Sequence, residues 1–310
     1  MHLPVIHLDI GMHTCRFGID WIACKFPLSD LDFNSLGWYR HDDHVVRFGS
    51  EHSIEGGSER IATVSLHRQW NLVVKAIRQY GRTELEFKWS PGAIRDESRE
   101  RFHAAIGQFV SGGYEELLSD GWVSYIEAAC DIFHARTAQL LIYRPRHAYS
   151  RAKHNVVDGS TTLYIGRGTE RNRYTAYDKA EQMRRRYGYV LRPSRCRIEN
   201  RRKLHMLFAD LANCSNWFSG LLVANRACAR SCDDSPEWHF FLDRCVRLGV
   251  QRAISSCSDN VRRRYIRFLE RAREEWWQSD FIWEHWPIEC AAFDAHMRGA
   301  AELPEAVFLN

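Results

Sequence analysis

The chain has 310 residues and a formal net charge of +4, with 45% hydrophobic and 26% charged residues. This length is enough for one large domain or two ordinary ones with a substantial core. No apolar run approaches the ~18 residues that a membrane-spanning helix needs, and the N-terminus lacks the pattern of a secretory signal. We therefore expect a cytoplasmic protein that does not bind a membrane.

The ten cysteines have irregular spacings and include no C-x-x-C pair. Cys228 and Cys232 lie four residues apart, but no histidine pair follows them at the spacing of a zinc finger. We expect reduced thiols that act as small core residues, as is usual in cytosolic proteins.

Positive charge is concentrated in one part of the chain. Residues 144–203 contain 17 Lys or Arg against 5 Asp or Glu, a local balance of +12, so the rest of the chain is acidic. Most of these cations are arginines, whose planar guanidinium group suits phosphate. The block indicates a surface that binds a polyanion such as DNA. The alternative is a solvated helix face with local acidic partners.

Strand and helix patterns alternate over the first two thirds of the chain. Apolar and β-branched alternation predicts strands over 17–26, 60–67, 83–89, 121–133 and 195–202. In the first of these, Ile19, Trp21, Ala23 and Lys25 are expected on one face. Helical spacing is seen over 69–81, over 97–118 with a break near Gly112-Gly113, and over 135–150. A hairpin within 161–177 then leads into a helix from about Asp178 to Tyr187.

The patterns after Lys203 are helical, and Ser235-Pro236 provides an N-cap followed by proline at the first helical position. We predict an α+β fold with an antiparallel-sheet core and flanking helices, plus an all-helical C-terminal region. The predicted domains are 1–205 and 206–310. The tryptophan-rich segment 274–286 reads either as a partner surface or as ordinary core.

Three acidic residues are candidate ligands for a divalent cation. Glu127 and Asp131 lie four apart in a predicted strand, which puts both on one face with Ala129 between them. Mg²⁺ and Mn²⁺ favour a few carboxylates completed by water. Glu199 is the third candidate, on a strand face that it shares with arginines. The alternative is that these acids simply pair with the arginines on a solvated sheet.

A tyrosine between the hairpin and the helix is the candidate nucleophile. A free phenol, with a pKa of about 10, reacts poorly unless nearby cations or a metal favour its phenolate. Lys179, Arg171 and Arg173 are close in sequence, and the helix N-terminus adds a site for an anion. These features suit transesterification of a phosphodiester. The chemistry alone does not choose between Tyr177 and Tyr174.

The order of four segments resembles the rolling-circle replication initiator family of small plasmids and filamentous phages. The segments are IDWIACKF, VSYIEAACDIF, TLYIGRGTERNRYTAYDKAEQ and RCRIENRR, within roughly 18–203. The resemblance implies a protein that binds a replication origin and nicks one strand. Its tyrosine becomes joined to the new 5′ end, and the free 3′-hydroxyl primes synthesis.

Carried over by position, the resemblance makes Tyr177 the nucleophile, with Lys179 in the same motif. Glu127, Asp131 and Glu199 become the acids of a Mg²⁺ or Mn²⁺ site. The implied partners are origin DNA, double-stranded and locally single-stranded, a second copy of the chain in a homodimer, and a host helicase. The arginines expected to contact DNA are Arg167, Arg171, Arg173, Arg184, Arg185, Arg195, Arg197 and Arg201.

Two other functional readings remain open. In the first, His7 and His13 hold the metal of a two-histidine nickase, although Gly11 and Met12 interrupt the alternation that such a strand needs. In the second, the chain is a non-catalytic DNA-binding protein that regulates a plasmid or phage replicon, with arginines on phosphates and tyrosines stacked on bases.

Overall fold

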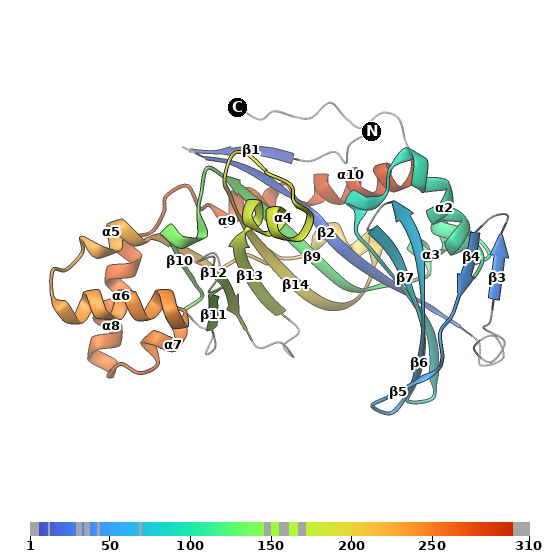
Figure 1. Ribbon diagram of the computed structural model, residues 1–310, viewed down its shortest axis with the longest axis horizontal. Coiled ribbons are helices and arrows are strands. Elements are labelled where there is room, and N and C mark those ends of the chain that lie inside the picture. The colour runs from blue at the N-terminus through green and yellow to red at the C-terminus, as the bar shows by residue number, and fades with distance from the viewer. Residues whose placement is uncertain are drawn as a thin grey trace.

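A large antiparallel sheet dominates the computed structural model, which describes residues 6–11, 13–28, 33, 38–41, 44–67, 70–145, 150–154, 161–166 and 172–299 (Figure 1). Eleven of the described strands form this sheet in the order β11-β12-β13-β14-β9-β2-β8-β7-β6-β5, with β1 beside β2. Its strands are β1 (Ile6–Ile10), β2 (His13–Pro27), β5 (His52–Ile54), β6 (Gly57–His67), β7 (Trp70–Gln79), β8 (Arg82–Trp89), β9 (Trp122–Phe133), β11 (Ser150–His154), β12 (Thr161–Ile165), β13 (Asn172–Asp178) and β14 (Arg195–Leu207). Two further ladders pair β3 (Trp38–His41) with β4 (His44–Arg47), and β10 (Leu140–Tyr143) with β15 (Leu222–Asn225).

Helices flank the sheet and fill the C-terminal region. The described helices are η1 (Pro91–Ala93), α2 (Asp96–Gly107), α3 (Gly113–Ser119), η2 (Thr137–Gln139), α4 (Lys179–Tyr187), η3 (Phe208–Asn213), α5 (Arg226–Arg230), α6 (Pro236–Leu248), α7 (Val250–Ile254), α8 (Asp259–Arg271), α9 (Ser279–Glu284) and α10 (Trp286–Arg298). The predicted fold class is therefore confirmed. None of the described helices has the length and hydrophobicity needed to cross a lipid bilayer.

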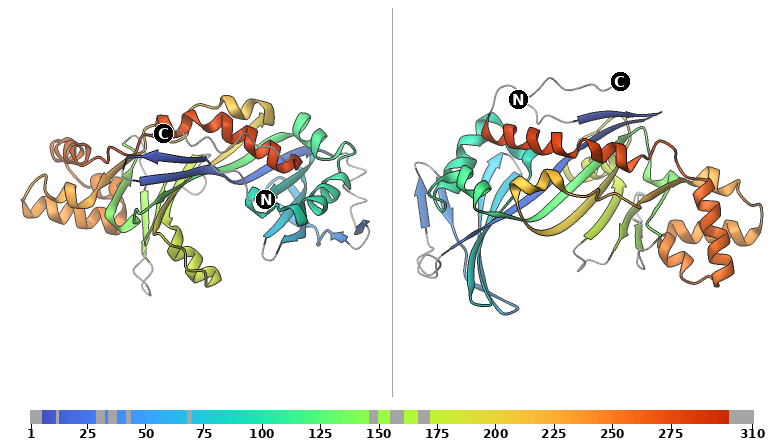
Figure 2. Two further views of the ribbon diagram at one scale, coloured as in Figure 1. Left: turned by 90° about the horizontal axis from the view of Figure 1, so that it is seen from above. Right: turned by 180° about the vertical axis from the view of Figure 1, so that it is seen from behind.

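The two faces of the sheet differ in what covers them. Helix α10 crosses one face, and α4 lies on the opposite side (Figure 2). The face under α10 is apolar: along β9 it presents Ile126, Ala128, Cys130 and Ile132, all fully buried. Successive residues of a strand point to opposite faces. The residues of β9 that lie between these four therefore project toward the α4 side, where the candidate site lies.

The tryptophans of the C-terminal segment belong to the core. Trp283 and Trp286 stack with ring centroids 4.7 Å apart, and both contact Trp217 at 5.0 Å. All three rings are buried in the hydrophobic cluster that also contains the sheet residues. Of the two readings of this segment, the structure supports ordinary core.

A second hydrophobic cluster lies within the helices α5 to α8, at the left of Figure 1. It includes Trp238, Phe241 and Leu242 of α6, packed with Leu141 and Tyr143 of β10. The chain then returns to the sheet from Trp276 onward. The division into domains 1–205 and 206–310 stays a prediction, and the core packing joins residues from both sides of it.

Two predicted helices are strands in the structure. Segment 69–81 forms β7, because Leu72, Val74 and Ala76 alternate into the core while Val73 and Ile77 add apolar residues on the other face. An apolar strand of this kind has no clear period of two, so its spacing resembles that of a helix. Segment 135–150 holds η2 and then β10. The region after Lys203 is also not wholly helical, since β14 continues to Leu207 and β15 follows.

Candidate active site

The site lies on the face of three neighbouring strands, β13, β14 and β9. The antiparallel register pairs Tyr177 with Arg197 and Arg197 with Asp131, and it pairs Arg201 with Glu127. Directly opposite residues in adjacent strands point to the same face, so these side chains gather on one surface. Glu199, two residues from each arginine, joins them there. The candidate nucleophile and the candidate acids therefore lie together.

Tyr177 is held at the end of β13, just before α4. Its side chain is only 7% exposed, and its hydroxyl donates a hydrogen bond of 2.5 Å to Oε1 of Glu199. Burial, followed by the negative charge of Glu199, raises the pKa of the phenol above its ordinary value. The hydroxyl is thus protonated at neutral pH, with a carboxylate already placed to accept its proton.

Helix α4 begins and ends as the sequence predicts. The side chain of Asp178 is the N-cap and accepts a hydrogen bond of 2.9 Å from the backbone N–H of Glu181. Gly188 follows the last turn with a left-handed φ of 71°, a conformation that glycine adopts without steric cost. The cap fixes the point where the chain leaves β13, and so fixes Tyr177 relative to the helix.

Asp20, Glu127 and Glu199 form an acidic cluster in which one oxygen from each side chain lies within 4.8 Å of the others. Among the described residues, this is the group of His, Cys, Asp or Glu side chains arranged to hold an ion. Burial and the charge of Glu199 raise the pKa of Glu127, against the opposing effect of Arg201. Three hard oxygen donors at this spacing fit Mg²⁺ or Mn²⁺.

Asp20 reaches the cluster because of an irregularity in β2. Ile19 pairs with Ala128 of β9, and Trp21 pairs with Glu127, so Asp20 is the extra residue of a β-bulge. Adjacent residues of β9 point to opposite faces, so Ile19 and Trp21 do as well. The expectation that Ile19 shares a face with Trp21 is therefore wrong, and the same bulge is why Asp20 was not predicted as a site residue.

A buried carboxylate supports the bulge from the other face of the sheet. Oε1 of Glu289 on α10 accepts a hydrogen bond of 3.1 Å from the backbone N–H of Ile19. A Cβ atom on Gly18 would lie 2.8 Å from the same oxygen, so a larger residue there would require the carboxylate to shift. Burial raises the pKa of Glu289 to about 8.

Asp131 lies outside the acidic cluster because Arg197 binds it. The guanidinium group contacts both oxygens of Asp131, Nε at 2.6 Å and Nη2 at 2.8 Å, and its Nη1 lies 2.9 Å from Oδ1 of Asp20. Burial alone would raise the pKa of Asp131, but the charge and hydrogen bonds of Arg197, together with the charges of Lys179 and Arg16, hold the pKa below its ordinary value. Asp131 as a metal ligand stays a prediction, and the geometry favours Asp20 in its place.

Two further cations border the cluster. Arg201 places Nη2 3.0 Å from Oε2 of Glu199 and Nε 3.2 Å from Oε1 of Glu127. Lys179 donates a hydrogen bond of 2.9 Å to the side chain of Gln182, and its ammonium lies 5.8 Å from the centre of the Tyr177 ring. Burial, and then the charge of Arg197, lowers the pKa of Lys179. A buried ammonium of this kind releases a proton more readily than an exposed one.

The other described arginines that were predicted to bind DNA lie on three different elements, α4, β13 and β14. Arg184 and Arg185 pair with Glu181 on the exposed side of α4, at 2.6 and 3.0 Å. The guanidinium of Arg173 lies 5.8 Å from the ring centre of Tyr164, and that of Arg195 lies 4.7 Å from Phe133. Arg167 and Arg171 fall outside the described residues.

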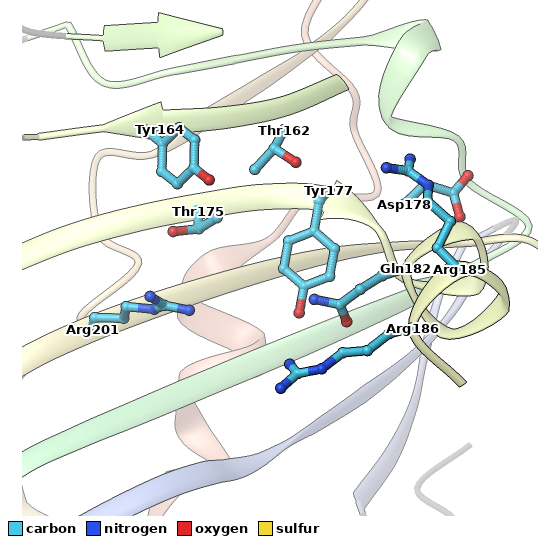
Figure 3. Close-up of a pocket in the computed structure, with 9 residues that line it drawn as sticks. All are labelled: Thr162, Tyr164, Thr175, Tyr177, Asp178, Gln182, Arg185, Arg186 and Arg201. Atoms are coloured by element: carbon cyan, nitrogen blue, oxygen red, sulfur yellow. The ribbon is translucent and has the colours of Figure 1, made fainter. Parts of the chain in front are cut away.

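A cavity of about 320 Å³ opens beside Tyr177 and is shown in Figure 3. Its lining comes from β12, β13, β14 and α4: Thr162, Tyr164, Thr175, Tyr177, Asp178, Gln182, Arg185, Arg186 and Arg201. The Tyr177 hydroxyl points between Gln182 and Arg186 on one side and Arg201 on the other (Figure 3). Arg186, which the sequence did not single out, also lines the adjoining cavity over the acidic cluster.

The two histidines of the alternative metal site are engaged elsewhere. Nδ1 of His13 lies 2.8 Å from the backbone oxygen of Phe133, and its ring meets Trp276 edge to face at 4.9 Å. His7 stacks on Phe133. Neither belongs to the acidic cluster.

Comparison with solved structures gives a distant likeness. No family model matches the chain, and no curated protein matches it. A solved structure of a rolling circle replication initiator protein from Geobacillus stearothermophilus aligns with 61% of this chain and 74% of its own, with 13% sequence identity and a TM-score of 0.37. At this score the similarity by itself carries no inference about activity.

Proposed function

We propose that this protein is a DNA strand transferase that nicks one strand of an origin through Tyr177 and so starts rolling-circle replication. The observation that carries the proposal is the hydrogen bond from the Tyr177 hydroxyl to Glu199, a member of the acidic cluster. It joins a nucleophile, a proton acceptor and a set of metal ligands in one place. The order of the sequence motifs supports a role in replication.

The proposed reaction exchanges one phosphodiester for another. The phenol oxygen of Tyr177 attacks a phosphorus atom of the DNA backbone while its proton passes to Glu199. The bond from phosphorus to the 3′ oxygen breaks, and that oxygen takes up a proton to become a free 3′-hydroxyl. Lys179 is the candidate donor of this proton, because its pKa is lowered. The 5′ phosphate stays joined to Tyr177, and the reverse reaction reseals a strand.

Cationic side chains and a divalent ion would hold the substrate. Asp20, Glu127 and Glu199 would bind Mg²⁺ or Mn²⁺, which when present stabilises negative charge on the phosphoryl oxygens. Arg186 and Arg201 line both cavities that meet at Tyr177, where their guanidinium groups would bind the phosphate.

The test uses the full chain, a divalent cation and single-stranded oligonucleotides that tile its own replicon. We expect the wild-type protein to form a covalent adduct with one of them. Tyr177→Phe should form none, whereas Tyr164→Phe, a matched change in the same cavity, should keep the activity. Adduct formation by Tyr177→Phe at the wild-type level would overturn the assignment of the nucleophile.

The same experiment separates the non-catalytic alternative. A regulator of a replicon would bind DNA in gel-shift experiments but give no adduct with any oligonucleotide under any divalent cation. Homodimerisation and contact with a host helicase stay predictions from the resemblance, and a cytoplasmic location stays a prediction from the sequence.

A further inference from the structure

A second groove lies on the same face of the sheet, beside the acidic cluster. Its cavity of about 960 Å³ is lined by side chains of β2, β8, β9 and β14, among them Lys25, Arg82, Lys88, Trp122, Tyr125 and Lys203. Four of these six are cations and two are aromatic. None of them takes part in the proposed reaction, so the groove needs a separate explanation.

The charge of the groove is positive. Its carboxylates are Glu84 and Glu86, and Glu84 is paired with Lys25 at 2.7 Å. Arg82 and Lys203 are exposed and make no ion pair with a carboxylate in the part of the chain that the structure describes. A groove with this surplus attracts a polyanion and binds its phosphates at low ionic strength.

The groove's two aromatic rings lie beside a cation and a histidine. The Lys88 ammonium lies 4.2 Å from the ring centre of Tyr125, and Trp122 meets His205 edge to face at 5.2 Å. Rings on which bases stack, set between cations that track the backbone, are the recurring design of single-strand binding sites. In a duplex the base faces are already stacked on one another, so such rings favour an unpaired strand.

The groove also leads directly to the proposed reaction centre. The hydroxyl of Tyr125 donates a hydrogen bond to Oε1 of Glu127, a member of the acidic cluster. Trp122 and Tyr125 are three residues apart on β9, a span of roughly 10 Å along a strand. A strand lying in the groove over a few nucleotides would therefore arrive at the acidic cluster.

From these contacts we infer that the groove binds the single-stranded DNA segment that flanks the phosphate attacked by Tyr177. The inference rests on the proposed function, because that function supplies the attacked phosphate to which the bound strand leads. The groove itself, however, is testable without catalysis, because binding to it requires neither the nucleophile nor the metal.

The experiment measures the affinity of the full-length Tyr177→Phe protein for a fluorescein-labelled 12-mer of thymidylate in EDTA. When Trp122→Ala is added to the Tyr177→Phe protein, binding should weaken about 10-fold, which is the effect of losing one stacked base. Trp122→Phe, which keeps a ring, should stay close to the parent. Lys203→Ala should weaken binding and reduce its dependence on salt. Phe240→Ala and Arg263→Ala, on exposed positions of α6 and α8, are the matched controls and should have no effect.

Unchanged affinity in both Trp122→Ala and Lys203→Ala would overturn the inference. So would a 12-base-pair duplex that binds as tightly as the single strand and is weakened equally by both changes. The proposed function fails separately, through the absence of a covalent adduct with the wild-type protein. If the groove binds single strands but the wild-type protein never forms an adduct, single-strand binding by the groove stands and the proposed nicking activity is wrong.

Discussion

Glu199 accepts a hydrogen bond from the Tyr177 hydroxyl through Oε1 and pairs with Arg201 through Oε2, at 2.5 and 3.0 Å. One carboxylate thus joins the nucleophile of the proposed reaction to a cation that can bind phosphate. Because burial raises the pKa of the phenol, Tyr177 depends on a base to react at neutral pH. In the proposed reaction, Glu199 is that base.

Replacing Glu199 by glutamine tests its role as the proton acceptor. Glu199→Gln keeps the size and the polar contacts but removes the charge that receives the proton. We expect the rate of adduct formation to fall at least ~100-fold, the usual contribution of a positioned base. Circular dichroism checks that the protein remains folded. A rate within a few fold of wild type would show that another group takes the proton.

The two aspartates near Arg197 should differ in their effect on metal binding. Asp20→Asn removes a member of the acidic cluster, so the affinity for Mn²⁺ measured by calorimetry should fall at least ~10-fold. Asp131→Asn should stay closer to wild type, because Asp131 is not a member of the cluster and both of its oxygens are bound by Arg197. The reverse order would restore Asp131 as the ligand.

Arg197 should be important for stability as well as for the site. Arg197→Met leaves Asp131 buried without its cation, and breaking such a pair from one side costs ~3–5 kcal/mol. Urea denaturation should show this loss in the free energy of unfolding. Changing both residues, as Arg197→Met with Asp131→Leu, should recover most of the stability. If the double variant is as unstable as the single one, an unpaired buried charge is not the cause.

Glu289 predicts a pH dependence of stability. The carboxyl has a pKa of about 8 when folded, against 4.5 as its ordinary value, so the folded state holds the proton more tightly. Its contribution is fully present below about pH 4.5 and is lost as the pH rises through 8. Wild type should therefore lose on the order of a few kcal/mol relative to Glu289→Gln between pH 5 and 8. Parallel pH profiles for the two proteins would contradict this.

Local signals predicted the strand and helix around Tyr177 well. The helix expected from about Asp178 to Tyr187 and the alternation along 195–202 depend on a few neighbouring residues, and the structure has α4 and β14 in these places. The strand formed by segment 69–81 could not be predicted from local signals. Both of its faces carry apolar residues, and only the packing of the folded protein distinguishes them. Its strand character follows from β6 and β8 on either side.

The acidic cluster shows a different limit of sequence reasoning. Simple alternation puts Glu127 and Asp131 on one face of their strand, so the sequence was sufficient to predict the face on which Glu127 lies. Asp20 depends on a bulge that is supported by Glu289, 270 residues away in the chain. No local pattern in 17–26 indicates the bulge, so simple alternation along the strand does not bring Asp20 to the cluster.

The most direct measurement of the central claim is mass spectrometry of the protein after reaction with its oligonucleotide and nuclease digestion. We expect a nucleotide attached to the peptide that contains Tyr177, and to that residue within it. Attachment to Tyr125, whose hydroxyl also contacts the acidic cluster, or to Tyr164 would contradict the account.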